Sequence, residues 1–522
     1  MAGIDRAGVA AETSVETLTA LQKRKVDKAQ SIIEGRIVIA EGDLRKVLKT
    51  SVVSTVTSVE VLDKLAVVSG KTHFHVIYVD EVGEYKTAEL TADFNEKIAC
   101  ALLLAGQHAF CRAEVIDSDI SGVSENEIKI ASVTDISLTV LERQTSSFVT
   151  NTGGNVVALK KSQSVSSVSA FCRTSFMHEF EIETRNKIDR VLYAHYECLT
   201  KKTSFDNGVL RIEGEIEASI VYIMQGEEAL FKSVCETVPF IEEVSVSGLE
   251  SGGMLEVLTN VQSHTTNFKD TDFSASITAG VVVMQTRSVS VDTVVDAFSI
   301  TNELNLSYES SSFMHLADSL HVQEKISSTA EVNIQNMTLN KVVGSSIKNL
   351  LMTSIFVQED FVTVEGLANI TVFTEVGVDG SDERMTSSVD VEIPFSVRNH
   401  AYGTVKDDKV SAELFLSDVV VRHKRTNEID VSCILKINMF VYKHEEHVFV
   451  KEIAAGEIKA FETGAISFYI TRPGDTPFRI SKKFSMPIET ICSFNADVEN
   501  VLREEKEIPA GTQIVVYRRK CV

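Results

Sequence analysis

The sequence has no pair of cysteines at the short spacing that zinc sites use, and it has no block of basic residues. Its eight cysteines are spread over 522 residues without a Cys-x-x-Cys motif. This pattern predicts reduced, mostly buried thiols and argues against both a disulfide framework and a zinc site. With 51 basic and 74 acidic residues, the formal net charge is -23. Nucleic acid is therefore not an expected partner.

Long hydrophobic runs are also missing. Nowhere do about 18 uncharged apolar residues follow one another, as a transmembrane helix would require. The opening stretch, MAGIDRAGVAAETSVETL, carries Asp5 and Glu12 where a signal peptide would have an apolar core. We therefore expect no transmembrane segment and a cytoplasmic protein. The hydrophobic fraction is nevertheless 44%, so the chain is expected to fold into several packed domains.

The common catalytic motifs do not occur either. There is no Gly-x-Ser-x-Gly or Gly-x-Gly-x-x-Gly signature, and SGKT at 69–72 lacks the earlier glycine of a phosphate-binding loop. His73 and His75 share one face of an expected strand without a third metal ligand nearby, and we interpret them as exposed strand residues, like His444 and His447. We predict a non-enzyme without catalytic residues, metal or cofactor; the alternative is an enzyme whose site combines distant residues.

What the sequence does contain is a repeat. The aligned segments are LAVVSGKTHFHVIYV (65–79), VLRIEGEIEASIVYI (209–223) and FVTVEGLANITVFTE (361–375). In each segment apolar and polar residues alternate, which predicts a half-buried strand. Each also has a glycine at the same place, Gly70, Gly214 or Gly366, on the apolar face. We interpret these glycines as structural residues that permit a bend or close packing.

The sequence around the repeats predicts the domain boundaries. The segment 16–33 has apolar residues at helical spacing and ends near Gly35, which predicts an amphipathic helix. A Ser-, Thr- and Gly-rich stretch after the first repeat predicts a linker or a long crossing loop. The expected division is a helical region at 1–35, β domains at 36–145, 179–293 and 294–450, linkers at 146–178 and 451–465, and a terminal domain at 466–522.

The terminal domain has a different pattern. ISFYI predicts a strand, TRPGDT a turn and helix cap, PFRISKKF and MPIETICSFN two helices, and IPAGTQIVVY a turn and a last strand. Asp475 or Thr476 can cap the first helix, and Pro477 and Pro487 suit the first turns of the two helices. The expected order is βααβ.

These residues resemble the LysM family, in which a Gly-Asp-Thr turn follows the first strand and an Ile-Pro-Gly approach precedes the last. The resemblance implies a binding groove between the first turn and the second loop, where family members bind N-acetylglucosamine polymers. The implied partner-binding residues are Pro473, Gly474, Asp475, Thr476, Phe478, Ile480, Asn495, Pro509 and Gly511. Pro477 stands where the family usually has Leu, and ADVENVLREEKE adds acidic residues to the second loop. These departures favour a repurposed groove.

The full pattern is mainly β: three tandem β-sandwich-like repeat domains followed by a small α+β (βααβ) LysM domain. This arrangement resembles the SipL family of spore-coat morphogenetic proteins. The resemblance implies a scaffold of the mother-cell cytoplasm at the forespore surface and in the spore coat, whose LysM domain docks on the coat-basement ATPase SpoIVA. The alternative is a cell-wall or cortex protein that binds peptidoglycan.

Overall fold

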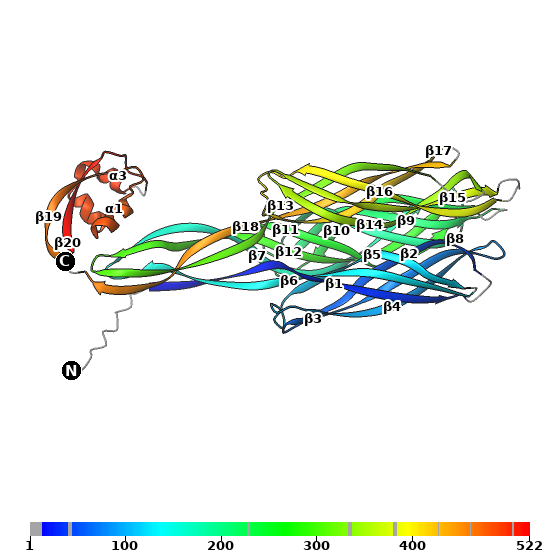
Figure 1. The fold of residues 1–522 in the computed structure, drawn as a ribbon, viewed down its shortest axis with the longest axis horizontal. Coiled ribbons are helices and arrows are strands. Elements are labelled where there is room, and N and C mark those ends of the chain that lie inside the picture. Colours follow the sequence, from blue (N-terminus) through cyan, green and yellow to red (C-terminus); the bar gives the residue numbers. More distant parts are fainter. Residues whose placement is uncertain are drawn as a thin grey trace.

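The computed structural model describes residues 13–39, 44–124, 126–226, 230–331, 337–378, 384–425, 427–459, 461–503 and 506–521. The described part is mainly β, with short helices near the C-terminus, which confirms the mainly β class and the α+β terminal region. The molecule is elongated (Figure 1), with a broad body, a narrower stalk and a small C-terminal module beyond the stalk.

Along the described residues, the strands before the C-terminal module fall into three successive groups of six, which we call units 1, 2 and 3. Unit 1 contains β1 (Thr13–Val38), β2 (Leu44–Leu62), β3 (Leu65–Asp80), β4 (Tyr85–Ala99), β5 (Ala109–Ser124) and β6 (Glu127–Thr152). Unit 2 contains β7 (Val156–Glu183), β8 (Ile188–Asp206), β9 (Val209–Met224), β10 (Leu230–Ser245), β11 (Met254–Lys269) and β12 (Asp272–Ser299). Unit 3 contains β13 (Asn302–Glu331), β14 (Met337–Gln358), β15 (Phe361–Val378), β16 (Arg384–His400), β17 (Lys409–Arg425) and β18 (Glu428–Ile458).

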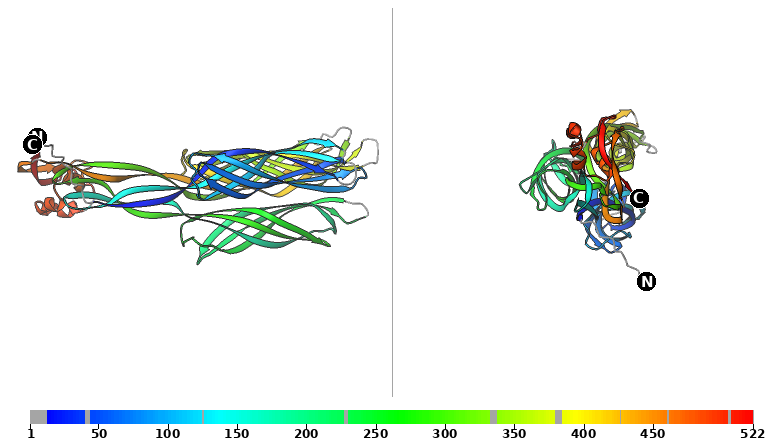
Figure 2. Two further views of the ribbon diagram at one scale, coloured as in Figure 1. Left: turned by 90° about the horizontal axis from the view of Figure 1, so that it is seen from below. Right: turned by 90° about the vertical axis from the view of Figure 1, so that its left-hand side faces the viewer.

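The strand order is the same in all three units. The second, third and fourth strands form one antiparallel sheet, with orders β2-β3-β4, β10-β9-β8 and β14-β15-β16. The first, sixth and fifth strands pair in the orders β1-β6-β5, β7-β12-β11 and β13-β18-β17. Each unit has its own hydrophobic core, to which both sets of strands contribute. The units lie side by side around the long axis, as the end-on view in Figure 2 shows.

The repeat glycines have the same surroundings in each unit. Gly70, Gly214 and Gly366 lie directly opposite Phe94, Phe240 and Phe395 in the strand register. A Cβ atom on any of them would lie 2.2–2.6 Å from that ring and 2.2–2.4 Å from a carbonyl oxygen of the neighbouring strand. The aromatic ring fills the space above the glycine, so no larger residue fits there without displacing backbone.

The stalk is built from the long strands of the three units. β1, β6, β7, β12, β13 and β18 contain 26 to 31 residues each and continue past the body (Figure 1). Val149, Val294 and Val450 occupy equivalent positions on the sixth strands, are fully buried, and pack into one cluster inside the stalk. The stalk therefore has a hydrophobic core to which all three units contribute.

The expected helix at 16–33 is wrong, because these residues belong to β1, which pairs with β6 over nearly its whole length. Ile33 and Ile37 are buried while Ile32 and Val38 are exposed, which is the period of two of a strand. Partners more than one hundred residues away in sequence, such as Thr152 opposite Thr13, override the local helical preference of the Lys, Gln and Ala residues. Residues 1–12 of the expected helical region lie outside the described residues.

The two expected linkers also lie mostly in strands. Residues 146–178 belong to β6 and β7 except for the short turn between them, and 451–465 is shared by β18 and β19. The serines that suggested a loop pair across strands instead: Ser166 lies 2.6 Å from Ser288, hydroxyl to hydroxyl. Hydroxyl pairs of this kind fit the polar face of a ribbon.

The C-terminal module follows β18 directly. It contains β19 (Phe461–Ile470), α1 (Pro477–Phe484), α2 (Ile488–Ser493), a 3₁₀ turn (Ala496–Val498), α3 (Glu499–Arg503) and β20 (Gln513–Cys521). The two strands pair antiparallel. The order differs from βααβ because part of the acidic insert forms the 3₁₀ turn and α3.

Candidate functional site

The C-terminal module has its own apolar core. The buried members are Ile480, Met486, Ile491, Cys492, Leu502, Ile508, Ile514 and Val516. They come from every helix and from β20, so the core fixes the helices against the sheet. The two loops that leave this core, at 471–476 and 506–512, are held in place by hydrogen bonds.

The first loop is a tight turn followed by a helix cap. The Asp475 N–H donates to the Arg472 carbonyl at 3.1 Å, with Pro473 second and Gly474, at φ 85°, third. This is the arrangement of a type II turn, which needs a residue with positive φ at its third position. The Thr476 hydroxyl then accepts from the Arg479 N–H at 3.3 Å and caps α1.

The Asp475 carboxylate points back into this turn. It accepts from the Arg472 N–H and from the Tyr469 hydroxyl, each at 2.7 Å. Burial raises the pKa of Asp475, but these two hydrogen bonds and the nearby Lys483 outweigh it and hold the pKa below the usual range. Asp475 is therefore a charged group that orients the turn.

The second loop is bonded to the first. The Ile508 N–H donates to the Asp475 carbonyl at 2.8 Å, and the Gly511 N–H donates to the Thr471 carbonyl at 2.9 Å. The Thr471 hydroxyl donates to the Pro509 carbonyl at 2.7 Å. These bonds make the two loops one continuous surface, on which Pro473, Pro509 and Gly511 are exposed.

Two residues that sequence reasoning missed complete this surface. The Glu507 carboxylate accepts from the Gly474 N–H, and the Arg479 guanidinium donates to the Gly474 carbonyl at 2.7 Å. Glu507 therefore binds the N–H of the turn glycine, and Arg479 binds its carbonyl. Their types and spacing follow no motif, and only the folded loops bring them together.

The structure corrects the expectation that Ile480 and Asn495 line the groove. Ile480 is only 1% exposed and belongs to the core. The Asn495 side chain donates to the Ile491 and Val515 carbonyls and accepts from the Val515 N–H, at 2.6–2.7 Å. All of its polar atoms are used to join the end of α2 to β20. Ile480 and Asn495 therefore match the family pattern because the fold of the module requires them, and not because they line the groove.

Phe478 does not face open solvent either. Its ring stands against Phe298 of β12, with the ring centroids 5.6 Å apart. Of the residues expected in the groove, those that the structure gathers on the loop surface are Pro473, Gly474, Asp475, Thr476, Pro509 and Gly511. Phe478 borders this surface in the first turn of α1 and is shared with the stalk.

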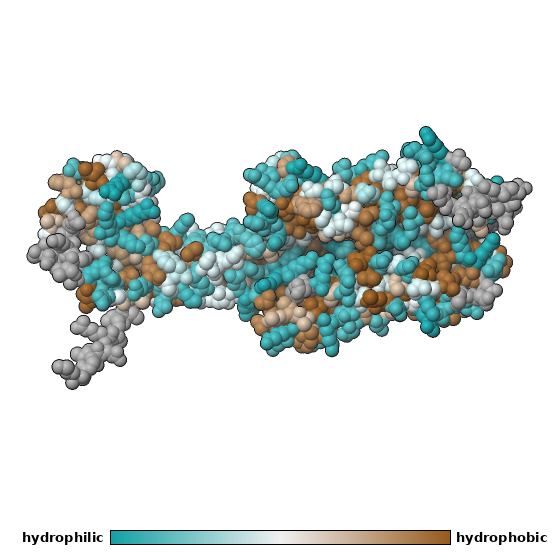
Figure 3. Space-filling view, viewed as in Figure 1, coloured by the Kyte–Doolittle hydropathy of each residue, from teal (hydrophilic) through white to brown (hydrophobic). Residues whose placement is uncertain are grey.

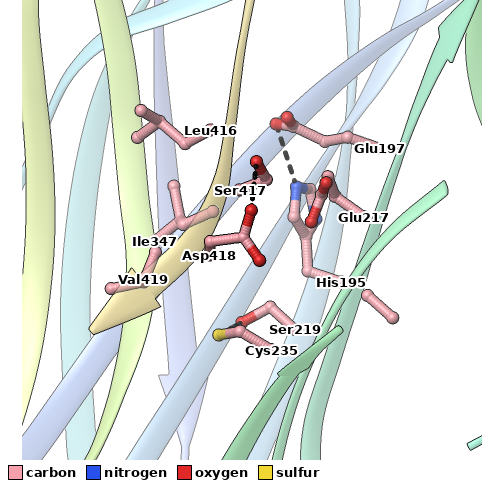
Figure 4. Close-up of a pocket in the computed structure, with 11 residues that line it drawn as sticks. His195, Glu197, Glu217, Ser219, Cys235, Ile347, Leu416, Ser417, Asp418 and Val419 are labelled. Carbon is pink, nitrogen blue, oxygen red and sulfur yellow. Dashed lines mark hydrogen bonds and ion pairs between the residues drawn. The ribbon is translucent and has the colours of Figure 1, made fainter. Parts of the chain in front are cut away.

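A second candidate site lies in the body, where units 2 and 3 meet (Figure 4). Its cavity of about 10 Å³ is lined by polar groups that include His195, Glu217, Cys235 and Asp418, and its size corresponds to a single ordered water. Burial raises the pKa of Glu217, against hydrogen bonds from Thr237 and Lys436. Burial also raises the pKa of the Cys235 thiol, which disfavours the thiolate that nucleophilic chemistry needs.

Of the four histidines expected to be exposed, His73 and His444 are exposed, whereas His75 and His447 are largely covered. His73 is exposed and contacts the Thr91 hydroxyl at 2.9 Å, but His75 is largely covered by Tyr193 of unit 2, which corrects the expectation that both are exposed. Burial and the nearby Lys49 lower the pKa of His75 to about 4. Among the described residues, no group of three or more His, Cys, Asp or Glu side chains is arranged to hold a metal ion.

Comparison with known families identifies the C-terminal module. Residues 469–516 match the model of the LysM domain, which confirms the resemblance seen in the sequence. LysM domains are associated with binding to peptidoglycan and related carbohydrates. No curated protein and no solved structure matches the chain. In the described part of the chain, no helix is long and apolar enough to cross a membrane.

Proposed function

We propose that this chain is a non-enzymatic scaffold that presents a LysM module for ligand binding at the end of a long stalk. The three units are copies of one sandwich-like β domain, arranged side by side rather than in line. The observation that carries the proposal is the pair of loops at 471–476 and 506–512, which are bonded into one surface at the far end of the molecule from the body. A rigid surface of this kind suits recognition, because binding costs little conformational entropy when the loops are already ordered.

For the partner, we propose the coat-basement ATPase SpoIVA, in the cytoplasm of the mother cell and at the forespore surface. The resemblance to spore-coat morphogenetic proteins supports this choice. So does the acidic insert, because it brings the exposed Glu507 to the loop surface that a glycan would contact. A partner surface with basic residues would complement the exposed Glu507 of the second loop.

Peptidoglycan is the second candidate ligand, and the LysM match at 469–516 favours it. The exposed loop surface carries backbone groups beside Pro473, Pro509 and Gly511, and a sugar could bond to such groups. The two candidates differ in charge and size, so a single set of titrations distinguishes them.

The test is a titration of the full chain with purified SpoIVA, with an N-acetylglucosamine hexamer and with soluble peptidoglycan fragments. Arg479→Ala and Glu507→Ala remove the two side chains that hold Gly474, and each is expected to weaken binding about tenfold. Glu489→Ala changes an exposed acid on α2 and serves as the control. Saturable binding of SpoIVA alone supports the scaffold, and binding of glycan alone supports the second candidate. If no ligand binds, or if the loop variants bind as well as the control, the proposal is wrong.

A further inference from the structure

The C-terminal module rests on the tip of the stalk. The Lys482 ammonium of α1 donates to both carboxylate oxygens of Asp296, at 2.7 and 2.8 Å. Next to this ion pair, the ring of Phe478 stands at 63° to the ring of Phe298, the edge-to-face geometry that aromatic pairs prefer. Asp296 and Phe298 both belong to the end of β12. We call this set of four side chains the tip contact.

A third connection closes the same junction. Lys459 lies between β18 and β19 and donates to the Ser299 carbonyl of the stalk and to the Ser485 hydroxyl at the end of α1, both at 2.9 Å. The segment that leads into the module is thereby held at the same place as α1. The module is fixed at both ends of α1, so its loops have a defined direction relative to the stalk.

The three units provide an internal comparison for the tip contact. Counting from the equivalent buried residues Val149, Val294 and Val450, the positions of Asp296 and Phe298 can be found on the sixth strands of the other units or directly after them. The equivalent residues are Asn151, Asp296 and Glu452 at the first position, and Gly153, Phe298 and Ala454 at the second. A large aromatic residue is therefore not required there by the stalk. Phe298, which is only 4% exposed, serves the contact with the module.

The tip contact also uses a side chain that borders the loop surface. Phe478 lies in the first turn of α1, directly beyond the Thr476 cap and the turn around Gly474. A ligand that spreads from the loops onto α1 would meet the Phe478 ring, which packs against Phe298. We propose that the stalk tip competes with the ligand of the C-terminal module, so that binding and opening of the tip contact are coupled. This proposal rests on the proposed function of the two loops.

The coupling relates the apparent affinity for the ligand to the fraction of molecules whose tip contact is open. When only a fraction of molecules is open, the apparent affinity falls by that fraction, and ten per cent open means about a tenfold weaker affinity. Variants that break the tip contact raise the open fraction and therefore tighten binding. A contact that merely orients the loops has the opposite effect, because its loss adds disorder to the free state and weakens binding.

The experiment uses the full chain and four proteins: wild type, Phe298→Ala, Lys482→Ala and Glu452→Gln. Phe298→Ala introduces the residue that unit 3 has at this position. Lys482→Ala removes the ion pair without changing the stalk, and it keeps the test valid if Phe298→Ala fails to fold. Glu452→Gln alters the position in unit 3 that is equivalent to Asp296 and is the control. Hydrogen exchange of residues 477–484 without ligand reports opening, and titration with an N-acetylglucosamine hexamer and with SpoIVA reports affinity.

We expect faster exchange and tighter binding in both tip variants, about tenfold tighter for Phe298→Ala and about threefold for Lys482→Ala, with the control unchanged. Because the hexamer is uncharged, added salt should tighten its binding to wild type but not to Lys482→Ala. Faster exchange with equal or weaker affinity overturns the competition and leaves the proposed function intact. Unchanged exchange overturns it as well. If no protein of the set binds either ligand, the proposed function fails together with the inference.

Discussion

The body and the C-terminal module obtain their contacts in different ways. In each unit of the body, the first strand pairs with the sixth, and partners such as Thr13 and Thr152 lie more than one hundred residues apart in sequence. The units meet through buried polar contacts, such as that of Lys49 with Ser346 and that of Lys436 with Glu217. In the module, the core residues and both loops come from one short segment of chain. We therefore expect the module to keep its fold when a unit is damaged, whereas damage to one unit should affect the others.

The largest effect is expected from a repeat glycine. In Gly366→Ala, the new Cβ would lie 2.2 Å from the Leu351 carbonyl oxygen and 2.5 Å from the Phe395 ring. Overpacking of this kind should lower the free energy of unfolding of the body by about 3 kcal/mol. Calorimetry should show the body transition at lower temperature and the module transition unchanged.

The control for this change is Gly122→Ala on β5, where the nearest atom to a new Cβ lies at 3.8 Å. The control should unfold like wild type. Equal unfolding temperatures for the Gly366 and Gly122 variants would contradict the structural role of the repeat glycines.

The converse change damages the module alone. Asn495→Ala removes the side chain that bridges the Ile491 carbonyl and the Val515 peptide groups, which leaves buried polar groups without partners. The module should lose about 2 kcal/mol of stability, while Asn500→Ala, at an exposed position on α3, should have little effect. Hydrogen exchange resolved by segment separates the two regions. A loss spread over the body as well would show that the module is not independent.

The contact between units should respond to pH. Burial lowers the pKa of Lys49 to about 7, against the attraction of Asp390. The ammonium contacts the Ser346 hydroxyl, the Ile347 carbonyl and the Tyr193 ring, none of which carries a negative charge. Below that pH, Lys49 is charged in both the folded and the unfolded chain, and the burial penalty is present in full. Above it, the folded chain releases the proton and the unfolded chain does not, so the unfolding free energy rises with pH.

Lys49→Met should therefore be more stable than wild type at pH 6, and this advantage should shrink by about 1 kcal/mol per pH unit above pH 7. Denaturant unfolding at several pH values measures the difference, in which the titration of groups that Lys49 does not influence cancels. Lys71→Met, at an exposed position on β3, is the control. An advantage that does not change with pH would mean that Lys49 is not the titrating group.

The smallest effect is expected at the surface of a unit. Arg211 contacts Glu213 at 2.9 Å and Glu243 at 3.3 Å, and all three side chains are partly exposed to solvent. Solvent screens such pairs, so Arg211→Ala should change the unfolding free energy by less than about 0.5 kcal/mol. A change of several times this size, measured by denaturant unfolding, would show that outer charges matter as much as the contacts between units.

Features that depend on neighbouring residues were predictable from the sequence. The alternation around Gly70, Gly214 and Gly366 predicted strands, and the turn around Gly474 predicted the LysM fold, because both patterns reflect local backbone requirements. The acidic insert was not predicted to form α3. The residue that holds this helix in place is Leu502, which packs into the module core, and this contact is visible only in the folded structure.

Features that depend on distant partners could not be predicted. The helical spacing in 16–33 gave no sign that β6 pairs with it, and the serines of 146–178 gave no sign of their partners on β12. Asn495 matched its family position, but only the structure shows that its polar atoms are used inside the module. Phe298 could have been noticed, because the equivalent residues are Gly153 and Ala454. Nothing in the sequence indicated that it meets Phe478.

The central claim is that the two loops of the C-terminal module form the ligand site. The most direct measurement is hydrogen exchange of the full chain with and without saturating ligand, first the N-acetylglucosamine hexamer and then SpoIVA. The account predicts slower exchange in 471–476 and 506–512 with either ligand that binds, and no change in the three-stranded sheets of the body. Slower exchange in the body, with those two loops unchanged, would contradict it.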